Sequence, residues 1–201
     1  MAFDNVVFPY YPMKHDITRT VEDPVNIVTN GTYEYRVKRQ RWDKFTWVIP
    51  TQTMKADQRD AIKSFLAARN HGLNSFKFQD PDLPSLTDAL LAHDHDSKWR
   101  LAIPFDENTA GTHPIFHHGT MTATVNGSPA SIIGYEVHNG IPLVHVSGSH
   151  SGSIVRISGP IYFAVRLANT FSEAYSALNS SNRPIGLNVS EIELQEVFGE
   201  Y

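Results

Sequence analysis

Alternating apolar and polar positions predict paired strands near the start of the chain. Apolar residues alternate with charged ones along Thr32–Gln40, as expected for a strand with one apolar and one charged face. The dipeptide Asn30-Gly31 before it is the strongest two-residue turn signal, and Val25–Thr29 precedes that turn. We therefore expect a β-hairpin here, followed by a further strand over Lys44–Ile49.

A spacing of three and four between apolar residues predicts one helix, from about Met54 to Asn70. Thr53 is suited to cap its start, and Gly72 supplies a stop after its end. The expected buried stripe consists of Ile62, Phe65, Leu66 and Arg69.

The second half of the chain has the pattern of an all-β protein. Three other segments lack a strand pattern: residues 1–24 are irregular with no clear period, Leu86–Ala92 fits either a short helix or a loop, and residues 168–184 are loop-like. Short strands at this spacing are typical of a sandwich or a barrel. The expected strands are Ser75–Phe78, Trp99–Ile103, Thr120–Val125, Ser131–Val137, Ile141–Val146, Ser153–Ile157, Ile161–Leu167 and one within Ile185–Phe198.

Composition is that of an ordinary globular protein. Of the 201 residues, 41% are apolar and 19% are charged, and the formal net charge of -4 gives no indication of nucleic-acid binding. The absence of cysteine excludes disulfides, thiolate zinc sites and a cysteine nucleophile. Because no signal-peptide pattern and no long apolar run is present, we expect a soluble protein made in a cytoplasm.

Two clusters near the N-terminus are candidate contact surfaces. Phe8, Tyr10 and Tyr11 form an aromatic arm that either packs on its own domain or lies on a neighbour. Four basic residues follow further on, and strand alternation divides them between two faces, which favours a solvated or interface surface over a phosphate track. They are Arg36, Lys38, Arg39 and Arg41.

Histidines are concentrated in two short stretches, "HDHDSK" from residue 93 and "THPIFHHGT" from residue 112. A zinc site needs three or four converging ligands. Pro114 and Gly119 exclude a helix that would present His113 and His117 on one face, and "HDHDSK" has the composition of a loop. We therefore expect solvated loop histidines and no metal site.

Motifs for enzymatic chemistry are also missing. The chain has no Gly-x-Ser-x-Gly element, no phosphate loop and no dinucleotide fingerprint. The serine-rich run "SGSHSGS" from residue 147 is expected to be a flexible turn, because neighbours in sequence rarely form a catalytic pair. We predict that the protein is not an enzyme and has no cofactor.

Several motifs, spread over both halves of the chain, resemble one family in their order and spacing. Within residues 33–83 they are "RW" before an aromatic strand, "FLAAR" in the helix, "HG" at its exit and then "FKFQDP". The strand pair "GSIVRISGPIYFAVRL" and the closing "IELQEV" agree as well. These segments are similar to the distal tail proteins of long-tailed phages and gene-transfer particles, formerly known only as a conserved domain of unknown function. The family usually has an acidic residue after its "VRF" element, where this chain has Ala168-Asn169.

The resemblance implies a mainly β fold with one helix: a tail-tube-like β-barrel or sandwich ring domain that carries an inserted small β lobe. Residues 1–80 and 159–201 would form the ring domain, and residues 81–158 the lobe. It also implies a ring of identical subunits, usually six, in the virion at the tail tip. The implied partners are the tail tube and the hub, with a tail fibre or receptor-binding protein as a further candidate, and without membrane insertion. The candidate assembly interface is Tyr10, Tyr11, Arg36, Lys38, Arg39, Arg41, Trp42 and Arg166.

Other interpretations stay open. Trp42, Trp47, Tyr33 and Phe45 can simply fill a core. The chain can also be a carbohydrate- or receptor-binding β module that relies on residues 81–158, a tail-tube or other tail structural protein, or a metal-dependent enzyme.

Overall fold

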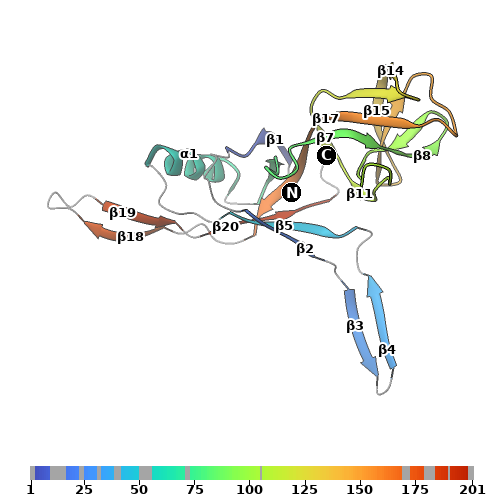
Figure 1. Cartoon of the computed structure of the whole chain (residues 1–201). Coiled ribbons are helices and arrows are strands. Elements are labelled where there is room, and N and C mark those ends of the chain that lie inside the picture. Colours follow the sequence, from blue (N-terminus) through green and yellow to red (C-terminus); the bar gives the residue numbers. More distant parts are fainter. Residues whose placement is uncertain are drawn as a thin grey trace. The chain divides into compact units, whose positions relative to one another are not determined.

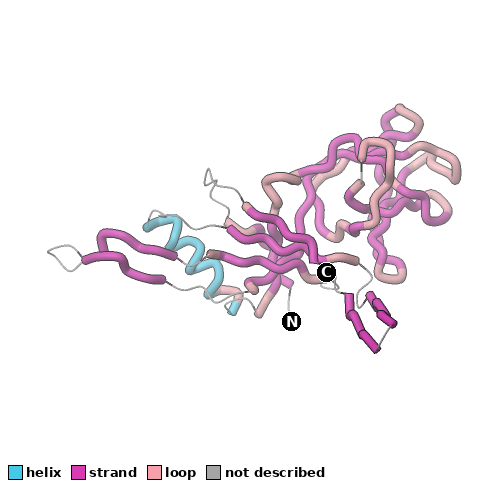
Figure 2. The backbone as a smooth tube through the Cα atoms, turned by 60° about the horizontal axis from the view of Figure 1, so that its bottom comes forward, coloured by secondary structure: helices cyan, strands magenta, loops and turns pink. Residues whose placement is uncertain are grey.

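A computed structural model describes residues 3–9, 17–22, 25–30, 33–38, 42–49, 56–70, 73–104, 106–168, 173–178, 184–189 and 191–198. The protein is mainly β, with 58% of residues in strands and one helix in the described part (Figure 2). This confirms the predicted class. The described strands form several separate sheets, and none of these closes into a barrel. No helix among the described residues is long and apolar enough to cross a membrane.

The chain divides into two compact units. Unit 1 consists of residues 1–77 and 164–200, and unit 2 of residues 78–163. The predicted domains, 1–80 with 159–201 and 81–158, stay a prediction, because compactness does not show that either part folds alone. The long strand β17 (Val155–Leu167) contributes its first part to unit 2 and its last residues to unit 1.

Unit 1 contains the main path of an open ten-stranded sheet. The path runs in the order β1 (Phe3–Val7), β6 (Ser75–Phe78), β17, β20 (Ile192–Glu196), β5 (Lys44–Ile49) and β2 (Thr18–Glu22). Four further strands, all in unit 2, join this sheet through β17. The β1–β6 pair is parallel, whereas β17–β20, β20–β5 and β5–β2 are antiparallel. The central strands bury apolar side chains that include Trp47, Ile49, Ile192 and Leu194. The predicted bounds of β5 and β6 are confirmed.

The expectation of an irregular N-terminal segment is wrong, because residues 1–24 contain β1 and β2 (Figure 1). Neither strand buries an alternate set of apolar side chains, and all five residues of β2 are exposed. A strand of this kind has no period of two in its sequence, because it is held by main-chain pairing with a distant strand.

The helix α1 (Ala56–Ala67) begins within the predicted range and packs on an aromatic cluster. Ile62 and Leu66 are buried, and Phe65 and Arg69 are half-buried, so the expected stripe is confirmed. The Phe65 ring lies edge-on to Phe8 and Phe76, with centroids 5.4 and 5.0 Å away. Phe8, the first aromatic residue of the N-terminal arm, therefore packs on its own unit.

Two hairpins of unit 1 each form a separate two-stranded sheet. The first, β3 (Val25–Asn30) with β4 (Tyr33–Lys38), confirms the hairpin predicted at Asn30-Gly31. The second pairs β18 (Glu173–Leu178) with β19 (Pro184–Val189), so the expected loop over residues 168–184 is wrong. The structure describes the backbone of these four strands, and Figure 1 shows each pair as neighbouring arrows.

Unit 2 is built on a four-stranded antiparallel sheet. Its order is β15 (Ile132–His138), β16 (Ile141–Val146), β9 (Lys98–Arg100) and β8 (Ala92–His95). The turn between β15 and β16 has both Asn139 and Gly140 at positive φ, 50° and 75°, as an Asn-Gly hairpin requires. Further short strands are β7 (Ser85–Leu90), β10 (Ala102–Ile103), β11 (His113–Pro114), β12 (His117–His118), β13 (Thr122–Val125) and β14 (Ser128–Ala130).

Two predictions in this region are wrong, and local backbone irregularity explains both. The expected helix or loop at Leu86–Ala92 is strand β7 and the start of β8. Leu86 and Ala89 are buried three residues apart because a bulge at Asp88, with φ 48°, adds a residue to the strand. The two strands expected at Ser153–Ile157 and Ile161–Leu167 are one continuous strand, β17, which passes through Gly159, with φ 152°, and Pro160.

Candidate functional site

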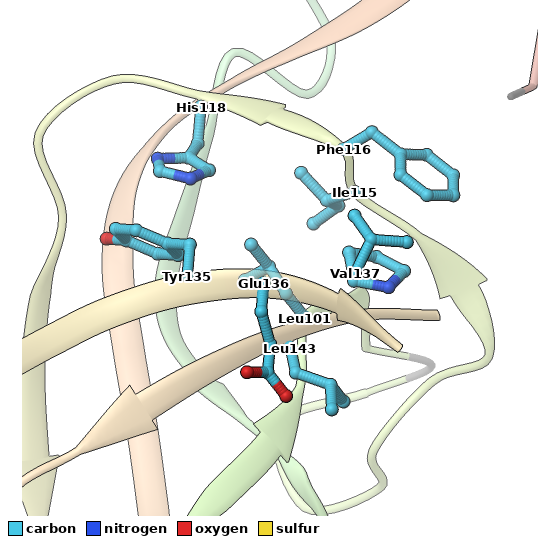
Figure 3. Close-up of a pocket in the computed structure, with 9 residues that line it drawn as sticks. Leu101, Ile115, Phe116, His118, Tyr135, Glu136, Val137 and Leu143 are labelled. Carbon is cyan, nitrogen blue, oxygen red and sulfur yellow. The ribbon is translucent and has the colours of Figure 1, made fainter. Parts of the chain in front are cut away.

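An open cavity of about 290 Å³ lies in unit 2 beside the edge strand β15 (Figure 3). Most of its lining is apolar, and two of its aromatic rings face each other. The lining residues are Leu101, Ile115, Phe116, His118, Tyr135, Glu136, Val137, Pro142 and Leu143.

Strand alternation and a crossing segment place these side chains. Tyr135 and Val137 are two residues apart on β15 and therefore share one face of the sheet. The segment from Ile115 to His118 connects β11 to β12 and supplies the other side of the cavity. It is fixed by two main-chain contacts: Ile115 N donates to Leu101 O at 2.9 Å, and β12 pairs with β17.

The His118 ring lies against Tyr135, with centroids 3.9 Å apart and the planes tilted by 38°. His118 Nδ1 donates to Gly119 O at 2.8 Å, which fixes the orientation of the imidazole. Figure 3 shows the two rings facing each other beside the cavity. Together they form an aromatic wall that a flat apolar group or an apolar side chain can contact.

The one carboxylate among the lining residues forms its ion pair away from the two aromatic rings. The Glu136 carboxylate points away from the His118–Tyr135 pair (Figure 3) and accepts a salt bridge from Lys98 Nζ at 2.8 Å. The Lys98 hydrogen bond lowers the pKa of Glu136, and burial raises the pKa of Tyr135. Near neutral pH Glu136 is therefore charged and Tyr135 is a neutral phenol. The mostly apolar lining suits the cavity to contact with an apolar or flat group.

The histidines serve separate structural contacts. His93 Nε2 donates to Asp96 O at 2.9 Å, and its ring lies edge-on to Trp99. His113 is paired with Ile103 in the β10–β11 ladder. The described residues contain no group of three or more histidine and carboxylate side chains placed to hold a metal ion.

The loop interpretation of "HDHDSK" is wrong, because these residues form strand β8, a turn and the start of β9. A bulge between His93 and His95 sets Asp94 out of the regular alternation. Asp94 accepts hydrogen bonds from His95 Nδ1 at 2.6 Å and from Arg100 Nε at 2.8 Å. These two contacts lower the pKa of Asp94.

Six of the eight predicted interface residues have side chains outside the described part of the chain. Tyr10, Tyr11, Arg39 and Arg41 are not described, and Arg36 and Lys38 are described only as backbone positions of β4. The other two lie in unit 1. Trp42 packs against Phe198 with ring centroids 5.7 Å apart, and Arg166 Nη2 lies 3.4 Å from Gln195 Oε1 on the neighbouring strand.

Sequence reasoning does not identify the cavity residues His118 and Tyr135. It groups His118 with loop histidines, and Tyr135 is one apolar position of an expected strand. Three alternating apolar residues of that strand, from Ile133 to Val137, are the available signal. No protein-family model matches the chain, and a search of the curated proteins finds no match.

Proposed function

We propose that this protein is a structural component of a phage tail tip: a distal tail protein whose copies form a ring, usually of six, between the tail tube and the hub proteins. The sequence resemblance over residues 33–83, 152–167 and 192–197 supports this proposal. The mainly β fold with one helix is compatible with it. The finer barrel or sandwich ring architecture belongs to the same proposal.

The open sheet of unit 1 is the observation that carries the proposal. Its two terminal strands, β1 and β2, are different in sequence and lie at opposite ends of the strand order. Val6 and Val7 on β1 and Val21 on β2 are exposed. Natural proteins usually protect sheet edges, because an exposed edge pairs readily with another chain.

Two different edges suit a ring. A heterologous contact joins one surface of a subunit to another surface of the next, and it closes when the rotation permits. Pairing of the β2 edge of one subunit with the β1 edge of its neighbour would repeat around the ring and leave no terminal strand.

The hairpins β3–β4 and β18–β19 also fit an assembly. Each is a two-stranded sheet in the described structure, and an isolated two-stranded hairpin is marginally stable in water. Contact with a neighbouring subunit or another tail protein would stabilise both. The basic residues predicted at the interface include Arg36 and Lys38 of β4.

Mass photometry of the purified protein and cryo-electron microscopy of particles test the ring. A closed ring of identical subunits is expected in at least one setting. A single chain in both settings would remove the ring from consideration.

The cavity in unit 2 favours a second candidate, a carbohydrate- or receptor-binding β module. Tyr135 and Phe116 offer aromatic surfaces, and aromatic-lined concave sites are typical of small-ligand binding. The test is a glycan array probed with the full chain and with Phe116→Ala. Glycan binding by the wild-type chain that Phe116→Ala abolishes would support this candidate. Absence of glycan binding by the wild-type chain would count against it.

A further inference from the structure

Among the strands whose side chains the structure describes, β15 carries the largest set of exposed apolar residues. It ends the four-stranded sheet of unit 2, with β16 as its hydrogen-bonded neighbour. Ile133, Tyr135 and Val137 alternate along it and are 61%, 42% and 45% exposed. Tyr135 and Val137 also line the cavity, so apolar edge and cavity form one continuous surface.

The edge has little of the protection that sheet edges usually carry. A bulge at Ile133, between the pairs Ile132–Val146 and Gly134–His145, affects only the start of the strand. From Gly134 to His138 there is no lysine, arginine or proline. The one carboxylate in this stretch, Glu136, is held by Lys98 of the same sheet.

We propose that β15 is a docking strand for a second copy of this chain. Two copies of Ile132–His138 would pair antiparallel about a two-fold axis and extend the sheet of unit 2 across both chains. A two-fold contact uses the same surface on both partners, so it requires a self-complementary strand. This contact involves unit 2 only and does not depend on the proposed ring.

The sequence of β15 selects a register centred on Tyr135. Tyr135 is the midpoint of Ile132–His138, and a register centred on it sets Ile133 of each copy, the bulged residue near the start of the strand, next to Val137 of the other. The exposed apolar row then continues across the axis on one face. A register centred on Glu136 would place two carboxylates directly opposite each other, which is unfavourable.

The cavity strengthens this choice of partner. In the Tyr135-centred register, the Ile133 side chain of the second copy lies beside Val137, at the rim of the cavity. Edge pairing gains affinity from main-chain hydrogen bonds, and pockets for alternate side chains add specificity. The area buried would be well below the roughly 1,600 Å² of a standard interface, so we expect a weak, concentration-dependent dimer.

A cysteine substitution tests the register directly, because the chain has no cysteine of its own. In Tyr135→Cys the two thiols would face each other across the axis. Opposite residues in an antiparallel pair have Cα atoms about 4.5 or 5.5 Å apart, within the range that a disulfide spans. We expect mild oxidation of the full chain to give a covalent dimer on non-reducing gels.

Ile154→Cys is the matched control, because Ile154 is an exposed apolar residue of unit 2 outside the strands. The covalent dimer should form at least tenfold faster with Tyr135→Cys. Adding Val137→Lys to Tyr135→Cys should remove this difference, because a lysine on an edge strand opposes pairing. Equal rates at the two cysteines, or no effect of Val137→Lys, would overturn the proposal.

A second measurement covers the possibility that Tyr135→Cys fails to fold. Sedimentation velocity of Val137→Lys against the wild-type chain should show loss of the concentration-dependent dimer while circular dichroism stays unchanged. A wild-type chain that shows no association at high concentration would also contradict the docking strand.

A double variant separates this contact from the ring. Val21→Lys lies on the β2 edge of unit 1, outside the docking strand. The variant that combines Val21→Lys with Tyr135→Cys should therefore form the covalent dimer as fast as Tyr135→Cys alone. A dimer lost on adding Val21→Lys would assign the association to unit 1 and overturn the docking strand.

Discussion

The Ser149 side chain is the hydrogen-bond partner of the buried indole of Trp99. The Trp99 indole N–H donates to Ser149 Oγ at 2.9 Å, and the serine hydroxyl donates to Val146 O at 2.7 Å. Trp99 and Ser149 are both buried. The run "SGSHSGS" therefore forms turns, as expected, and its Ser149 is buried and hydrogen-bonded.

Replacing Ser149 with alanine should lower the free energy of unfolding by about 1–3 kcal/mol, since the change leaves the buried indole N–H of Trp99 unsatisfied. Urea denaturation measures this. Ser151→Ala is the control, because Ser151 is exposed and should change stability by less than about 0.5 kcal/mol. Equal effects of the two substitutions would show that the Trp99 contact adds no stability.

Asp94 should make the stability of the protein sensitive to acid. Its pKa is lowered in the folded state by hydrogen bonds from His95 and Arg100, so the carboxylate stabilises the fold above its unfolded pKa of about 3.9. That contribution is lost as the pH falls through the lower folded pKa. Asp94→Asn should therefore show a smaller loss of stability than the wild type between neutral pH and about pH 3.

Asp96→Asn is the matched control for this titration. Asp96 is exposed in the adjoining turn and has φ 50°, a conformation that asparagine tolerates. Denaturation series at several pH values compare the two variants. An acid response of Asp94→Asn identical to that of the wild type would refute the role of the carboxylate.

At the scale of elements, the Asn-Gly turns fix the hairpins of unit 2. Gly127 joins β13 to β14 with φ 80°, and a Cβ at this position would meet nothing within 4 Å. Gly127→Ala should therefore destabilise by about 1–2 kcal/mol through backbone strain alone. Gly134 is equally open but lacks a positive φ, so Gly134→Ala should be neutral or slightly stabilising in thermal denaturation. A cost at Gly134 as large as at Gly127 would contradict this account.

Elements with a buried face or a strong turn signal are predictable from the sequence. The bounds of β5, β6 and β16 agree with the expected strands, because their apolar residues and turns are local signals. β2 cannot be predicted from its own sequence, because it is an exposed, mostly polar strand that is stabilised by pairing with the distant strand β5. β7 cannot be predicted either, because the bulge at Asp88 places its buried residues Leu86 and Ala89 three positions apart, as in a helix.

The cavity is predictable only in part. Alternation identifies the apolar row on β15, but not that the row is exposed or that β15 ends its sheet. His118 reaches Tyr135 because β12 pairs with β17, a contact between residues more than forty positions apart in the chain. No local pattern around "THPIFHHGT" contains that pairing.

At the scale of the whole molecule, a lysine on β2 should separate ring formation from folding. Val21 is 54% exposed and lies opposite Phe45 on the terminal strand of unit 1. Val21→Lys should shift the mass distribution in mass photometry from the ring to single chains, because an edge lysine opposes strand pairing. Ile154→Lys should leave the ring intact. Rings formed equally by both variants would exclude the β2 edge as the subunit contact.

The way in which unit 2 is attached to the sheet has a consequence for the insertions that it can accept. Unit 2 begins after Lys77 on β6 and ends at Phe163 on β17, and these two strands are neighbours in the sheet. Both junctions between the units therefore lie on adjacent strands. A segment whose ends lie on adjacent strands tolerates insertion well. Longer loops within unit 2 should therefore leave the pairing of β6 with β17 unchanged.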